Sequence, residues 1–243
     1  MSQKLMLPVN DCQMLVGYKN EPYKKHWGFT HYGIDCYDPS LVLWGMGDGE
    51  VVKVGEDSVF GNVVVVIYKD VWVHGQNKAM DLVARCYHMA EPAYVKEGQK
   101  VTTKDKLGKL GTTGKYSSGV HCHLELDTDT AHPLYVPGLA GDTSLFKKGI
   151  DTTIHPADVL YVKPTAPDSQ KVSNHGLSGW VTEKDLSFPT WPEESSQEPT
   201  EDYKAKYEEA QVKYAESQMT LEKANTEIAS LQEKIKKAQE ALA

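Results

Sequence analysis

The stretch Gly61-Asn-Val-Val-Val-Val-Ile-Tyr68 says most about how this 243-residue chain folds. Its valines and isoleucine carry branched side chains that pack well in strands, and the run is short for a helix. A continuous apolar run of this length is typical of a strand that is buried on both faces. We therefore expect this segment to lie in the interior of a covered sheet.

Further strand-like segments lie on both sides of this run. Alternating or β-branched patterns occupy residues 49–55, 83–89 and 119–126, and shorter ones with turn residues occupy 95–101 and 106–114. Because strands follow one another closely with almost no helical periodicity, we predict a mainly β domain, an antiparallel sheet or sandwich, over residues 1–162. Within it, residues 138–154 are expected to form a surface loop and residues 155–160 a closing turn.

The remainder of the chain differs in composition. Residues 163–199 are rich in proline and serine and are predicted to form a partly docked linker. Residues 200–243 repeat small or apolar residues in a heptad register without glycine or proline, which predicts a helix that forms a coiled coil. A single amphipathic helix folded back onto the β domain is the alternative. A homo-oligomer through residues 200–243 is therefore an expectation that depends on the first interpretation.

Composition excludes several classes of function. The formal net charge of −8 provides no basic surface for nucleic acid, and no run approaches the roughly 18 apolar residues of a membrane span. The first residues do not resemble a secretory signal. Four cysteines without a CxxC pair argue against a structural zinc site built on cysteine, and we expect buried free thiols.

Two histidine motifs carry the candidate chemistry, His31-Tyr-Gly-Ile-Asp35 and His121-Cys-His123. Each pairs two possible metal ligands at even spacing, so that on an extended strand both side chains face the same way. His31, Asp35 and one imidazole of the second pair would give zinc three ligands and leave one position open for water. The other imidazole, or His88, would then be free to act as an acid or base.

These motifs resemble those of the lysostaphin-type (LytM-like) zinc peptidoglycan endopeptidases. The resemblance is carried in order by His31–Asp35, Tyr87-His88, residues 95–101, residues 107–114 and residues 119–125, and covers roughly residues 28 to 160. It implies an antiparallel β domain with His31, Asp35 and His123 as zinc ligands and His121 and His88 as catalytic histidines. Cys122, between the paired histidines, departs from the family pattern and is interpreted as core packing, as is Cys36. Residues 70–84 and 127–154 look longer than a minimal family domain.

The resemblance implies a zinc-dependent endopeptidase that cleaves the stem peptide or cross-bridge of bacterial peptidoglycan. Two alternatives stay open: a non-catalytic relative that binds peptidoglycan or activates another hydrolase, and a structural virion or envelope component. Because the chain shows no export signal, we expect a phage lysis or tail protein that acts on the bacterial cell wall.

The other polar and aromatic candidates have simpler interpretations. Glu125 is expected either to orient an imidazole from behind the metal or to face solvent. The remaining histidines, which lack a partner at ligand spacing, are expected to be solvated or hydrogen-bonding; they are His26, His74, His132, His155 and His175. Aromatic residues that could line a substrate groove are Trp27, Tyr32, Tyr116 and Tyr135.

Overall fold

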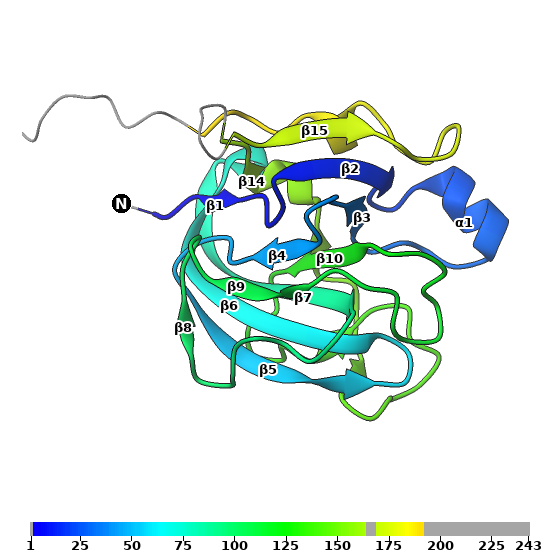
Figure 1. Ribbon diagram of the computed structural model, residues 1–243, viewed down its shortest axis with the longest axis horizontal. Coiled ribbons are helices and arrows are strands. Elements are labelled where there is room, and N and C mark those ends of the chain that lie inside the picture. Colours follow the sequence, from blue (N-terminus) through cyan, green and yellow to red (C-terminus); the bar gives the residue numbers. More distant parts are fainter. Residues whose placement is uncertain (1, 164–168, 192–243) are drawn as a thin grey trace, which may run out of the picture. The chain divides into compact units, whose positions relative to one another are not determined.

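Strands dominate the part of the chain that the structure, a computed structural model, describes: residues 2–163 and 169–191 (Figure 1). The prediction of a mainly β domain is thereby confirmed. The predicted helix over 200–243 lies outside the described residues, so the coiled coil and the oligomer remain predictions. Within the described residues, no helix is long and apolar enough to cross a membrane.

One large sheet holds the described part of the chain together. Neighbouring strands follow the order β15 (Lys171–Asn174), β2 (Asp11–Val16), β3 (Ile34–Tyr37), β10 (Cys122–Asp127), β7 (Lys78–Met89), β6 (Gly61–Val73), β5 (Gly49–Asp57) and β8 (Lys100–Val101). β13 (Thr153–Ile154) also pairs with β10. All pairs are antiparallel except β15 with β2, which is parallel and departs from the predicted antiparallel sheet.

Smaller elements surround this sheet. Three two-stranded sheets pair β1 (Leu5–Met6) with β14 (Leu160–Tyr161), β4 (Val42–Trp44) with β9 (Lys106–Lys109), and β11 (Tyr135–Val136) with β12 (Lys147–Lys148). Within residues 2–163 and 169–191, the helices are α1 (Glu21–Trp27) and the 3-10 turns η1 (His74–Gln76), η2 (Pro156–Asp158) and η3 (Lys184–Leu186). The expected surface loop over 138–154 is only partly confirmed, because Phe146 is fully buried and Thr153 and Ile154 are buried against β10.

Hydrophobic side chains cover both faces of β6, as its sequence predicts. Val64 and Val66 belong to a first core, which also contains residues of β4 and β9 that lie over the sheet (Figure 1). Val63 and Val65 point the other way into a second, smaller core with Phe146. The segment that follows β10 adds Val136 and Phe146 to this second core, so it covers the face opposite β4 and β9.

The C-terminal part of the described chain is attached to the sheet edge. β15 extends the sheet beyond β2, and a turn containing Asp185 packs against the residues that follow β2. Asp185 is 1% exposed and accepts hydrogen bonds from the backbone of Tyr18 and from the backbone and hydroxyl of Thr182. Burial alone would raise the pKa of Asp185, but these bonds and His155 outweigh it and lower the pKa to about 2.

Replacing this carboxylate should destabilise the fold in a pH-dependent way. A group whose pKa is lowered in the folded state contributes stability above its unfolded pKa and loses it as the pH falls through the folded value. We expect Asp185→Asn to lower the free energy of unfolding by about 2 kcal/mol at pH 7, with the difference from wild type vanishing toward pH 2. Urea unfolding across this pH range measures it. Asp142→Asn, at an exposed pair with Lys147, is the control and should change little; an equal loss in both variants would contradict the account.

Candidate metal centre

The pairing of β3 with β10 places Asp35 directly opposite His123. Asp35 Oδ1 lies 2.8 Å from His123 Nδ1. The neighbouring residues Cys36 and Cys122 are also opposite each other, but they belong to the first core and are free thiols. The expected packing role of these two cysteines is therefore confirmed.

His31 completes the group from outside the strand. Its Nε2 atom lies 3.0 Å from Asp35 Oδ1 and 3.0 Å from His123 Nδ1. The expectation that His31 and Asp35 share one extended strand is wrong, because β3 begins only at Ile34 and the chain bends at Gly33. A Cβ atom on Gly33 would lie 2.3 Å from the carbonyl oxygen of Leu124, so only glycine lets the chain pass this close to β10.

The three donor atoms fit a zinc ion. Two imidazole nitrogens and one carboxylate oxygen lie within 4.8 Å of one another, a set that zinc accepts. Tetrahedral zinc with bonds near 2.0–2.1 Å separates its ligands by about 3.3 Å, so the three donors need to move apart by only a few tenths of an ångström. Three protein ligands also leave a coordination position for water, as in catalytic sites.

One backbone carbonyl fixes the ring of His31. Its Nδ1–H donates to the carbonyl of Gly17 at 2.9 Å, which leaves the Nε2 lone pair facing Asp35 and His123. Gly17 is held in turn by a hydrogen bond from its N–H to the carbonyl of Trp180, 2.8 Å long. The residue that follows β2 and the segment that follows β15 therefore both contribute to the orientation of His31.

The two predicted catalytic histidines lie next to each other beside the metal ligands. The rings of His88 and His121 have centroids 4.9 Å apart, and His121 Nε2 is 3.7 Å from Asp35 Oδ1. His88 Nδ1 donates to the carbonyl of Thr113 at 2.8 Å, and His121 Nδ1 donates to that of Gly119 at 2.7 Å. Because carbonyls only accept, both rings carry their lone pair at Nε2.

A bulge turns His88 toward the site. The pairing of β7 with β6 changes register between Cys86 and Met89, and His88 has a φ of 65°, a left-handed conformation unusual for a residue other than glycine. In a regular strand His88 would face away from its neighbour Tyr87. Instead both rings lie near His123, with centroid distances of 5.4 Å for Tyr87 and 6.2 Å for His88.

Burial and neighbouring charges shift the pKa values of the cluster. Burial would raise the pKa of Asp35, but His31, His121 and the hydrogen bond to His123 hold it well below the usual range. For His123, burial opposes protonation, yet Asp35 and Glu125 raise the pKa to about 9. Burial and the nearby His123 and His121 lower the pKa of His88 to about 4, so that ring is neutral at pH 7.

Glu125 lies behind the ligand His123, as one of its two sequence-based interpretations expected. Its Oε1 atom is 3.5 Å from His123 Nε2, and its carboxylate is 3% exposed. Arg85 and Tyr87 contact the same carboxylate. Sequence reasoning assigned no role to the side chains of these two residues. Their alternate positions along β7 show that they share a face of the strand, but not which residues of β10 lie opposite them.

The ring contacts recorded for Trp27, Tyr116 and Tyr135 involve none of the three candidate ligands. Tyr23 of α1, not singled out in the sequence, has its ring 5.0 Å from that of His31. Tyr116 is exposed and lies 6.1 Å from the ring of Phe29. Trp27 is also exposed, and Tyr135 contacts His132 rather than a site residue.

Of the other histidines, His155 caps η2 and contacts Asp185, which agrees with its expected hydrogen-bonding role.

Comparison with known families places these residues in one domain. The sequence model of Peptidase family M23 matches residues 30–134. That range contains every predicted ligand and catalytic histidine, namely His31, Asp35, His88, His121 and His123. The match to Peptidase family M23 agrees with the family to which the motifs pointed.

Solved structures with similar folds include three peptidases. A zinc-containing peptidase from Vibrio cholerae is 24% identical, with 51% of this chain and 37% of that chain covered and a TM-score of 0.42. The catalytic domain of the prophage-encoded M23 protein EnpA from Enterococcus faecalis is 25% identical, with 49% and 82% covered and a TM-score of 0.39. The catalytic domain of lysostaphin from Staphylococcus simulans is 18% identical, with 60% and 89% covered and a TM-score of 0.40. This chain spans little more than a third of the Vibrio cholerae peptidase.

The close approach at Gly33 predicts a strong effect of a single methyl group. Gly33→Ala would push the chain before β3 away from Leu124 and from His123, whose Nε2 lies 2.8 Å from the added Cβ. We expect a loss of about 1–3 kcal/mol in the free energy of unfolding, together with weaker zinc binding. Gly141→Ala, at a position with nothing within 4 Å, is the matched control. Urea unfolding and zinc titration measure both effects, and wild-type behaviour of Gly33→Ala would refute the proposed packing.

Proposed function

We propose that this protein is a zinc-dependent endopeptidase that hydrolyses peptide bonds in the stem peptide or cross-bridge of bacterial peptidoglycan. The observation that carries the proposal is the convergence of His31 Nε2, Asp35 Oδ1 and His123 Nδ1, with two further imidazoles beside them. Membership of residues 30–134 in peptidase family M23 supports a peptidase. The choice of peptidoglycan rests on the resemblance of the motifs to lysostaphin-type enzymes.

Each side chain has a distinct part in the proposed reaction. His31, Asp35 and His123 would hold zinc, which supplies the Lewis acidity that activates water at neutral pH and polarises a carbonyl group. His121 and His88 present the lone pairs of Nε2, so either ring can accept the proton of the attacking water. The protonated ring then becomes a donor, first to the developing oxyanion and then to the leaving amine as the carbon–nitrogen bond breaks.

The non-catalytic alternative is less well supported. A protein that only binds peptidoglycan or activates another hydrolase has no need for three converging ligands and two oriented imidazoles. Here the rings of His88 and His121 each donate a hydrogen bond to a backbone carbonyl. Fixing a ring in this way costs conformational entropy, but it keeps the imidazole oriented for proton transfer. A catalytic site is therefore the simpler interpretation of the cluster.

We further propose, on the sequence alone, that the enzyme belongs to a phage lysis or tail apparatus and acts on the cell wall of the host. Several copies joined through residues 200–243 would bind a polymeric wall more tightly than one copy. A virion component and an enzyme are compatible roles. The predicted coiled coil lies outside the residues that the structure describes, and the proposed phage origin rests on the sequence.

Two histidine variants separate metal binding from proton transfer. His123→Ala removes a proposed ligand and should lose both zinc and hydrolysis. His121→Ala keeps the three ligands and should retain zinc while the rate falls by about 10²- to 10⁴-fold. The measurements are zinc content after gel filtration and the appearance of new amino termini in purified cell walls. A chelator should abolish the wild-type activity and added zinc should restore it.

Exposed His175 supplies the control, because His175→Ala should leave zinc content and rate unchanged. Full hydrolysis by zinc-free His123→Ala would exclude the proposed mechanism. Loss of zinc from His121→Ala would instead make His121 a ligand and overturn the division of roles.

A further inference from the structure

A buried arginine lies behind the candidate metal centre. Arg85, in the middle of β7, is 0% exposed and pairs across the sheet with Glu125 of β10. Its guanidinium donates to Glu125 Oε2 at 3.1 Å and to Asp127 Oδ2 at 2.9 Å. A charge so completely removed from water persists only when it is paired and hydrogen-bonded, and here one guanidinium serves two carboxylates.

Glu125 connects this ion pair to the metal ligand His123. One carboxylate oxygen, Oε2, accepts from Arg85 and also from the Tyr87 hydroxyl at 2.9 Å. The other oxygen, Oε1, is thereby left facing His123 Nε2 at 3.5 Å. The ring of Tyr87 also stacks on the imidazole of His123, with centroids 5.4 Å apart and an interplanar angle of 17°. The imidazole is thus held at one edge and on one face.

We propose that Arg85 is a positioning residue of the metal centre: it fixes Glu125, and Glu125 orients His123 so that Nδ1 faces Asp35 and His31. This inference rests on the proposed zinc site. An N–H at Nε2 that points at a carboxylate leaves the lone pair at Nδ1, the atom that must bind the metal. The planar guanidinium suits this task because it holds two carboxylates in fixed directions, which a flexible ammonium group does not.

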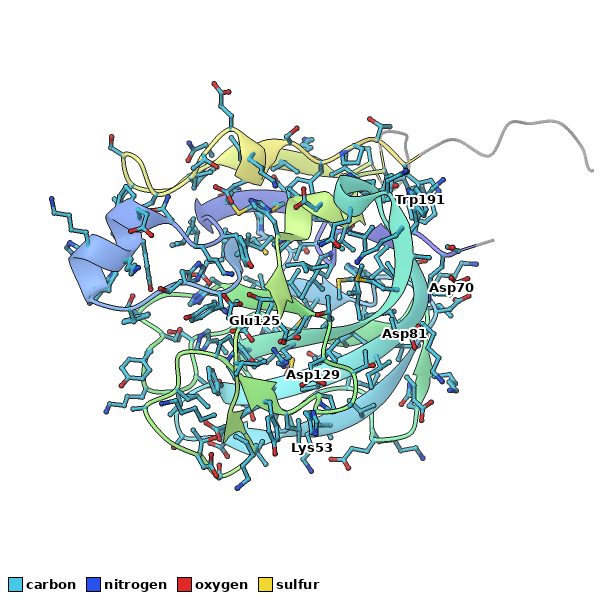
Figure 2. The ribbon with its side chains drawn as sticks, turned by 180° about the vertical axis from the view of Figure 1, so that it is seen from behind. Lys53, Asp70, Asp81, Glu125, Asp129 and Trp191 are labelled. Atoms are coloured by element: carbon cyan, nitrogen blue, oxygen red, sulfur yellow. The ribbon has the colours of Figure 1, made fainter. Side chains whose placement is uncertain are left out.

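The segment that follows β10 encloses this network. The carbonyl of Pro133 accepts from Arg85 Nε at 2.9 Å, and the hydroxyl of Thr152 donates to Asp127 at 2.6 Å. Asp129 donates its backbone N–H to the same carboxylate at 2.8 Å. Figure 2 looks onto this side, with Glu125 near the middle of the view and Asp129 below it. Residues 128–152 lie within the stretch 127–154, which looked longer than a minimal family domain in the sequence. They also exclude water from the network behind His123.

Asp127 offers a matched control for Glu125. Both carboxylates are buried on the same strand and both bind Arg85. The partners of Asp127 are Arg85, Thr152 and the backbone of Asp129, whereas Glu125 also contacts His123. A purely structural network predicts the same consequences for either residue. The positioning role predicts that Asp127, unlike Glu125 and Arg85, has little effect on the metal.

The test is the zinc affinity of the full-length chain, measured by competition with a chromophoric chelator. We expect Glu125→Gln and Arg85→Lys to bind zinc about 10- to 100-fold more weakly than wild type, and Asp127→Asn to bind it nearly as well as wild type. If Arg85→Lys does not fold, Tyr87→Phe replaces it, because this variant keeps the ring on His123 and loses only the bond to Glu125. It too should bind zinc more weakly.

A second measurement follows the imidazole itself. In the zinc-loaded wild type, nitrogen NMR should find the His123 proton on Nε2, and that signal should shift in Glu125→Gln but not in Asp127→Asn. Wild-type zinc affinity in Glu125→Gln and Arg85→Lys, or an equal loss in Asp127→Asn, would overturn the positioning role. A wild-type protein that binds no zinc would instead overturn the proposed function.

Discussion

The antiparallel pairing of β3 with β10 is the constraint on which the site depends. It sets Asp35 opposite His123 on one face, and it sets Cys36 opposite Cys122 on the other. A slip of one residue would exchange the two faces, so that thiols would replace the ligands. The apolar contacts of the first core therefore hold the register that the metal centre requires.

Most of the groups that orient the ligands come from outside the strands that carry them. The carbonyl of Gly17, at the end of β2, fixes His31, and Trp180 holds Gly17 from the far end of the described chain. On the other side, the segment with Pro133 encloses the arginine behind His123. Gly17, Trp180 and the end of this segment lie outside the range that matches the family model. Residues 30–134 thus carry the candidate ligands and the two candidate catalytic histidines, while flanking residues help to fix their orientation.

The sequence predicted the parts of this protein that local pattern encodes. The valines of β6 indicated a strand buried on both faces, and the even spacing in His121-Cys-His123 separated inward imidazoles from a packing thiol. The spacing of His31 and Asp35 predicted that their side chains lie together, but a bend at Gly33 rather than a continuous strand brings them together.

What the sequence did not predict depends on partners far away in the chain. Nothing near Arg85 shows that Glu125 will lie opposite it, because strand pairing decides this. The bulge that turns His88 toward the site arises from a mismatch between β6 and β7, which neither strand reveals alone. The edge strand β15 has the composition of a linker, and only its pairing with β2 makes it part of the sheet.

The central claim is that the pairing of β3 with β10 builds a zinc site from two nitrogens and one carboxylate oxygen. A crystal structure of the zinc-loaded protein, with anomalous data collected at the zinc absorption edge, tests it most directly. The account predicts one zinc ion bound by His31 Nε2, Asp35 Oδ1 and His123 Nδ1, with the Nε2 atoms of His88 and His121 facing its remaining position. An anomalous peak held by other residues, or none at this place in zinc-loaded crystals, would contradict it.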